Sequence, residues 1–179
     1  MLKKMKKVIV SLVALTVLTF GCSQEKKSET TSANDEPKEE KVMQASTSSV
    51  SSEQLKSILS SYFSVKDALV KTDAAEAKSA LAKLLESLGS EFEQMKALTK
   101  QMHEKEDVEE IRSDFDDLSQ QIYVLVKNNA DSKDQKVYKQ FCPMAFNNEG
   151  AFWLSDKEEI RNPYFGDKML KCGKVQEEL

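Results

Sequence analysis

Three stretches of this 179-residue chain carry apolar side chains at helical spacing, and this pattern constrains the fold more than any other feature. In the clearest stretch, 108–125, apolar residues follow one another at alternating intervals of three and four and form one continuous seam. The stretches 52–71 and 74–102 repeat the same period. Three amphipathic helices in one short chain can bury their apolar faces against one another, so we expect an antiparallel bundle rather than a coiled-coil dimer. The three stripes are formed by Leu55, Ile58, Leu59, Tyr62, Phe63 and Leu69; by Leu81, Leu84, Leu88, Met95, Leu98 and Met102; and by Val108, Ile111, Phe115, Leu118, Ile122 and Leu125.

Capping residues mark where these helices are expected to begin. Each start has Ser or Asp three positions before Glu or Gln, which is the arrangement of a capping box. Gly89 interrupts the second stretch, which predicts a break into two helices there; one kinked helix is the alternative. The last helix is expected to end near Asn128, so the bundle has three to four helices. The capping pairs are Ser51 with Gln54, Asp73 with Glu76, Ser90 with Glu93, and Asp107 with Glu110.

Residues 1–21 have the composition of a secretory signal peptide. Four lysines precede an apolar run, 8–20, that is shorter than a typical membrane span. The Gly-Cys pair that closes it resembles a lipobox, so we expect Cys22 to be acylated and to become the mature N-terminus. The lipid would hold the protein to a membrane of the cell envelope, on the periplasmic side. The alternative is a plain cleaved signal with an unused cysteine.

Residues 22–50 are predicted to form a disordered tether. They are rich in Ser, Thr, Glu and Lys, and such a composition buries too little surface to offset the entropy of ordering. The remaining residues, 51–179, have the length of one domain. Without the four lysines of the signal peptide, the formal net charge falls from −4 to −8. Charges of both signs are interspersed, which excludes the clustered positive charge that binding to nucleic acid requires.

The last part of the chain, about residues 135–179, has a different character. It holds the only tryptophan and two of the three cysteines. The stretches 137–146 and 151–154, separated by an Asn-Asn-Glu-Gly turn, indicate a small β-hairpin. A proline directly after Asn162 indicates a short helix that runs from there to Cys172. Because an isolated hairpin is marginal in water, we expect a mainly α protein whose hairpin and short helix dock on the bundle as a cap.

Four sulfur-bearing side chains in this cap form two pairs by spacing. The proline after Cys142 favours an extended backbone, so Cys142 and Met144 are expected to point to one side. Met169 and Cys172 lie three residues apart and would be neighbours on the expected helix. Soft sulfur ligands select soft metals, Cu(I) above all. A structural disulfide between the two cysteines, with the methionines as core residues, is the alternative in an oxidising compartment.

His103 is the only histidine, and it lies at the expected turn between the second and third stretches. It is either an exposed polar turn residue or a fifth ligand that the bundle supplies to the cap. The chain has no Cys-x-x-Cys motif and no recognisable acid–histidine pair to activate a nucleophile. We therefore do not expect an enzyme.

Three segments of the cap, Cys-Pro-Met-Ala-Phe, Gly-Ala-Phe-Trp-Leu-Ser and Glu-Ile-Arg-Asn-Pro-Tyr-Phe-Gly-Asp-Lys-Met-Leu-Lys-Cys-Gly, resemble an uncharacterised domain family. That family occurs in small bacterial lipoproteins and at the C-terminus of CusB-type periplasmic adaptors of copper and silver efflux pumps. The resemblance covers about residues 55–179. Many members also have a histidine near the end of the central helical region, and His103 is shifted from that place.

The resemblance implies that the protein handles Cu(I) or Ag(I) outside the cytoplasm. It also implies Cys142, Met144, Met169 and Cys172 as the ligands, and a CusB-type efflux adaptor as a partner. We therefore expect a membrane-tethered domain that buffers the ion or delivers it to an efflux system. The alternative is a disulfide-stapled interaction module without metal.

Overall fold

The computed structural model describes residues 50–130 and 135–179. The expected signal peptide, the expected lipidation residue Cys22 and the tether up to residue 49 lie outside the described residues. Across the described ranges, no helix combines the length and the apolar character needed to cross a membrane. The bundle consists of the helices α1 (Ser52–Val70), α2 (Ala74–Ser87), α3 (Glu93–Glu104) and α4 (Val108–Asn128).

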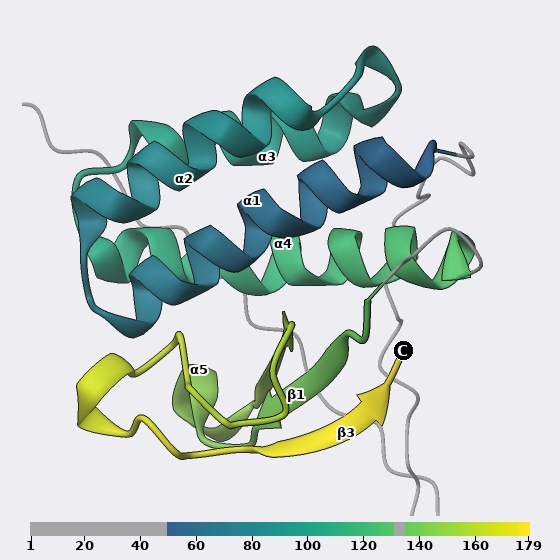
Figure 1. Cartoon of the computed structure of the whole chain (residues 1–179). Helices are drawn as coiled ribbons and strands as arrows, with labels where there is room; N and C mark the ends of the chain where they lie inside the picture. Colours follow the sequence, from purple (N-terminus) through teal and green to yellow (C-terminus); the bar gives the residue numbers. More distant parts are fainter. Residues whose placement is uncertain (1–49, 131–134) are drawn as a thin grey trace, which may run out of the picture. The chain divides into compact units, whose positions relative to one another are not determined.

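The four helices lie in two layers relative to the C-terminal part of the chain. α1 and α4 lie next to the sheet, and α2 and α3 pack on their other side (Figure 1). The helical starts follow the expected caps in most places. Ser51 and Asp73 cap α1 and α2 as predicted, because each side chain accepts a hydrogen bond from the N–H three residues on. Asp107 caps α4 through the N–H of Glu109, two residues on, instead of through Glu110.

The predicted break at Gly89 is confirmed. α2 ends at Ser87, and a 3-10 turn, η1 (Ser90–Phe92), leads into α3. Gly89 begins this turn with an extended backbone, at φ −72° and ψ 178°. No side chain caps η1 or α3, so the expected capping box of Ser90 and Glu93 is not formed.

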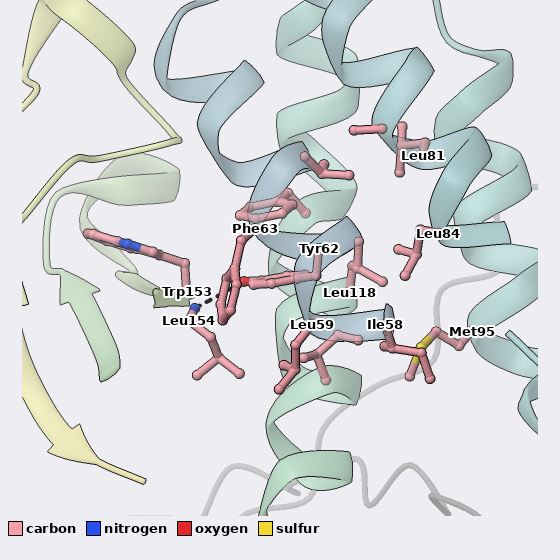
Figure 2. Packing of buried hydrophobic residues seen from close by; sticks show 14 of the residues in the cluster. Ile58, Leu59, Tyr62, Phe63, Leu81, Leu84, Met95, Leu118, Trp153 and Leu154 are labelled. Atoms are coloured by element: carbon pink, nitrogen blue, oxygen red, sulfur yellow. Dashed lines mark hydrogen bonds between the residues drawn. The ribbon is translucent and has the colours of Figure 1, made fainter. Parts of the chain in front are cut away.

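The predicted stripes form the hydrophobic core. All of their residues are buried except Leu98 and Val108, which pack against the core while partly exposed. Figure 2 shows Tyr62 between the helices, with Leu154 of the C-terminal segment beside it. Trp153, the residue before Leu154 in the chain, extends away from the helices. One face of the sheet therefore packs on the bundle core, and the other face points away from the helices.

The C-terminal part forms a three-stranded sheet rather than a hairpin alone. The strands are β1 (Tyr138–Cys142), β2 (Ala151–Ser155) and β3 (Lys174–Glu178), in the antiparallel order β2-β1-β3. The predicted hairpin is confirmed as β1 and β2, whereas β3 was not predicted. The connection between β1 and β2 contains α5 (Ala145–Asn148), in which Phe146 and Asn147 have left-handed φ values of 49° and 58°. α5 is therefore a tight turn and not a regular helix.

Two tyrosines cover the open edge of β2. The hydroxyl of Tyr62 accepts a hydrogen bond from the N–H of Leu154 at 3.0 Å, and the hydroxyl of Tyr164 donates to the carbonyl of Phe152 at 2.6 Å (Figure 2 shows the first). Burial raises the pKa of both phenols, so both stay neutral. The other edge strand, β3, carries charged side chains and an irregular register, and both features discourage the addition of a further strand.

The predicted short helix over 163–172 is wrong. This segment contains one 3-10 turn, η3 (Gly166–Lys168), and otherwise has irregular backbone. Gly166 has a left-handed φ of +54°, and a Cβ at this position would collide with Thr72 Oγ1 and the guanidinium of Arg112. The segment thus follows the surface of the bundle end instead of coiling on itself, and only glycine fits where it comes closest.

Candidate thiol site

The structure brings Cys142 and Cys172 together. Their Sγ atoms lie 3.0 Å apart, although the residues are 30 positions apart in the chain. Both are free thiols. Cys142 is 0% exposed and Cys172 is partly buried, so one sulfur is sealed inside the cap and the other lies near its surface.

The register of the sheet sets the position of Cys142. Cys142 pairs with Ala151, and Gln140 pairs with Trp153, so these four side chains share one face of the sheet. The other face carries Leu154 and packs on the bundle. The thiol therefore lies on the face that points away from the helices.

The segment that follows β2 packs on the face of the sheet that carries Cys142 and Gln140. The Nε2 of Gln140 donates to the carbonyls of Lys157 and Glu158 at 2.8 and 3.0 Å, while its Oε1 accepts from Trp153 Nε1 at 2.7 Å. Gln140 is completely buried, and these bonds satisfy its amide. The covering segment is thus fixed to the sheet face that also carries Cys142.

Gly173 brings Cys172 against the end of β1. Its φ is +146°, and a Cβ there would lie 3.0 Å from both the carbonyl oxygen of Phe141 and the ring of Trp153. A Cβ at 3.0 Å would force its neighbours to shift, and side-chain-bearing residues rarely adopt a φ of +146°, so this close approach favours glycine. Cys172 precedes this point directly and is placed beside Cys142 as a result.

The Cys142 thiol makes its neighbour Cys172 less acidic. The adjacent Cys142 thiol, together with burial, raises the pKa of Cys172 to about 11. At neutral pH this thiol is therefore protonated. Because thiolate is the form that binds metals and attacks disulfides, either reaction at this site must first remove a proton.

The structure does not group the predicted methionines with the thiols in the way their spacing suggested. Met144 has helical backbone angles, φ −95° and ψ −9°, because the strand ends at Cys142 and the chain turns at the proline. Met144 is 48% exposed whereas Cys142 is buried, so the two do not share an environment. Met169 follows η3 and is partly buried, and its carbonyl accepts from the N–H of Cys172 at 3.0 Å.

His103 is not part of this arrangement. It lies in the last turn of α3, a helix of the bundle. α3 packs on α2 and α4, and the layer of α1 and α4 separates it from the sheet (Figure 1). Within residues 50–130 and 135–179, no group of three or more His, Cys, Asp or Glu side chains is placed to hold a metal ion.

Sequence reasoning missed Arg112, which fixes the cap to the bundle. Its side chain is 3% exposed and lies on α4, where an arginine would be expected to face solvent. The guanidinium donates to the carbonyl of Leu69 at 2.7 Å, to Thr72 Oγ1 at 2.9 Å and to the carbonyl of Pro163 at 2.8 Å. It therefore joins the end of α1, α4 and the cysteine-bearing loop. The only sequence signal was its position next to the apolar Ile111 of the third stripe.

The bundle, but not the thiol site, matches a known family model. Residues 58–134 match a family described as a protein of unknown function, DUF3347. This range begins in α1 and includes all of α4, and it stops before β1. No curated protein and no solved structure matches the chain. The resemblance to CusB-type adaptors lies mainly outside the matched range and stays an expectation.

Proposed function

We propose that this chain is a heavy-metal-binding domain that holds Cu(I) or Ag(I) between Cys142 and Cys172. The observation that carries the proposal is the 3.0 Å separation of two free thiols from distant parts of the chain, one of them fully buried. Two thiolates are soft ligands, and soft ligands favour Cu(I) and Ag(I) over Mg²⁺ or Ca²⁺. The resemblance of the surrounding motifs to the efflux-adaptor family supports the same ions.

Met169 is the third candidate ligand, because it is partly buried and its backbone is bonded to Cys172. Met144 and His103 are weaker candidates. Met144 is half exposed, and His103 lies on a helix that does not pack on the sheet. We expect both to contribute little to the affinity for the ion.

Binding would require a small movement of the two thiols. Two sulfurs that share one ion at about 2.3 Å, as in thiolate zinc sites, lie about 3.8 Å apart in a tetrahedral arrangement. The present separation is shorter, so the sulfurs would move apart by about 1 Å. We expect the side chain of Cys172 to make most of this movement, because Cys172 lies outside the strands while Cys142 ends one.

The proposed location is the cell envelope. An acylated Cys22 would anchor the protein to a membrane on the periplasmic side, and residues 23–49 would give the domain reach from the surface. There it would buffer the ion or pass it to an efflux system, with a CusB-type adaptor as the proposed partner. No catalytic step is part of the proposal.

Competition with a Cu(I) chelator tests the proposal. Protein purified without oxygen and with a thiol reductant should withhold one Cu(I) per chain from the chelator. Cys142→Ser and Cys172→Ser should each abolish most of this binding, whereas Met169→Leu should weaken it and Met144→Leu and His103→Ala should change it little. Reduced wild-type protein that fails to compete would refute metal binding.

The second candidate function is a disulfide-stapled interaction module without metal. The short Sγ–Sγ distance favours it, since 3.0 Å is closer than an ion shared by two thiolates requires. A disulfide here would close a loop of 30 residues and stabilise the fold by about 3 to 4 kcal/mol. Protein taken from cells would then be lighter than the dithiol by two hydrogen atoms, and either cysteine variant would lose this stability in the absence of any metal.

A further inference from the structure

The sheet that positions Cys142 constrains Cys172 only on its C-terminal side, where Gly173 leads into β3 and Lys174 pairs with Phe141 of β1. Cys142 belongs to β1 and is held by the ladder to β2, whereas Cys172 lies at the end of a segment with irregular backbone. We infer that Asn162 holds Cys172 opposite Cys142 and is the positioning residue of the thiol pair. The inference rests on the proposed use of these two thiols and adds to it the residue on which their proximity depends.

Asn162 joins the two ends of the loop that carries Cys172. Its side chain is 0% exposed, and its Nδ2 donates to the carbonyl of Cys172 at 2.8 Å. Its backbone N–H donates to the carbonyl of Leu170 at 2.8 Å. The start of the loop is therefore bonded twice to its end, and one of these bonds goes directly to the cysteine.

The other half of the same amide shapes the start of the loop. Asn162 Oδ1 accepts from the N–H of Tyr164 at 2.8 Å, which forms an Asx turn, and its carbonyl accepts from the N–H of Gly166 at 3.1 Å. A short helix was expected to begin at this position, and the local bonds resemble those of a helix N-cap, but no α-helix follows. All four polar groups of Asn162 are bonded within residues 162–172.

The chemistry of the amide explains why asparagine is needed here. The Tyr164 bond requires an acceptor, and the Cys172 bond requires a donor at the same short side chain. Aspartate and serine keep an acceptor for the turn but do not restore the donor at this distance. Loss of the Nδ2 donor would leave the carbonyl of Cys172 without its hydrogen-bond partner and would free the end of the loop.

The test measures how strongly each protein favours an intramolecular disulfide over glutathione. A thiolate of the protein attacks glutathione disulfide, forms a mixed disulfide and releases one glutathione. The second thiolate then displaces the other glutathione and forms the Cys142–Cys172 bond. Two electrons pass from the protein dithiol to glutathione disulfide, which becomes two glutathione molecules. The equilibrium constant is the effective concentration of one cysteine at the other and needs no metal.

Asn162→Asp and Asn162→Ser should each lower this effective concentration by about tenfold, since one buried hydrogen bond that orders the pair is lost. The matched control is Asn129→Asp. Asn129 is also buried, its Nδ2 donates to the carbonyl of Leu125 at 2.9 Å, and its Oδ1 accepts from Val50, away from the thiols. The control should keep the wild-type value even where its unfolding temperature falls.

Unchanged effective concentrations in both folded Asn162 variants would overturn the inference. So would an equal fall in the Asn129 control, because the effect would then reflect general loosening of the fold. Failure of both Asn162 variants to fold would also overturn it, since Asn162 would be a requirement of the whole fold. A wild-type protein that does not bind Cu(I) would refute the proposed function alone, because the glutathione equilibrium is measured without metal.

Discussion

Cys172 is the residue whose chemistry depends most on its neighbour. Its pKa is raised to about 11, first by the hydrogen bond with Cys142 and then by burial. A raised pKa means that the thiol keeps its proton at a pH where a free cysteine, with a pKa of about 8.5, is already half ionised. Reactivity toward iodoacetamide requires thiolate, so the rate of alkylation reports this ionisation directly.

In the reduced protein, alkylation of Cys172 should be slow at pH 8 and should rise with a midpoint near pH 11. Cys142→Ala removes the largest cause of the shift and should move the midpoint toward about 8.5. The rate at Cys172 can be followed by mass spectrometry of the peptide that contains it. Identical pH profiles in the two proteins would contradict the coupling between the thiols.

Arg112 is the residue whose loss should harm the fold most at the junction with the cap. Arg112→Ala would remove the guanidinium hydrogen bonds to the carbonyls of Leu69 and Pro163, and we expect the free energy of unfolding to fall by about 3 kcal/mol or more. Arg112→Lys should restore little of this stability, since one ammonium group cannot make the several hydrogen bonds that the planar guanidinium makes. Urea unfolding measures the effect. Arg161→Ala, at an exposed position, is the control and should change stability by less than about 0.5 kcal/mol.

At the scale of elements, the helices could be predicted from the sequence and most of the cap could not. Each helix carries its own period and its own cap, as Ser51 and Asp73 illustrate, so the information is local. β3 is mostly exposed and lacks the alternation that identifies a strand. The loop over 163–172 depends on where Gly166 meets the bundle, and that contact has no local signal.

The face of α4 that meets the sheet is another feature that could not be predicted from the sequence. The seam spacing turns Asp116 toward solvent in an isolated bundle, but the sheet packs there and leaves the carboxylate half-buried beside Tyr164 and Gln120. Burial raises the pKa of Asp116, and this effect is larger than that of the hydrogen bonds, which lower the pKa. The folded state therefore binds this proton more tightly than the unfolded state, and ionisation of Asp116 costs stability as the pH rises.

Asp116→Asn should accordingly gain stability relative to the wild type when the pH is raised from 3 to 7. The comparison uses the difference in unfolding free energy between the two proteins at each pH, which cancels the titration of unrelated groups. Asp117→Asn, at the exposed neighbouring position, is the matched control and should show no such gain. A difference that does not change with pH at Asp116 would contradict the burial of its carboxylate.

At the scale of the whole molecule, the expected lipid decides where the domain works. Cys22→Ser should abolish labelling by a radioactive fatty acid and should shift the protein from the membrane fraction to the soluble fraction, because acylation is the only anchor proposed. Cys142→Ser should leave both readouts unchanged and controls for the loss of a thiol. Wild-type protein that carries no lipid would rule out the lipoprotein assignment.

The thiol pair illustrates how far a whole site can be predicted. The sequence singled out Cys142 and Cys172, and it left both a metal and a disulfide open. It grouped each cysteine with the methionine nearest in the chain, because spacing is informative only within one element. The structure instead joins the two cysteines across 30 residues and turns Met144 outward. Which ligands complete a metal site stays a prediction.

The tyrosine-covered edge of β2 has a consequence for solubility. The hydrogen bond from Leu154 to Tyr62 links residues 92 positions apart. The open edge of β2 is therefore covered by Tyr62 only after α1 has formed and packed against the sheet. Until then the strand offers unpaired N–H and C=O groups to any other chain. A variant that lacks α1 should therefore not yield a free three-stranded sheet in solution. We expect it to aggregate through β2, because the helical layer that covers this edge would be missing.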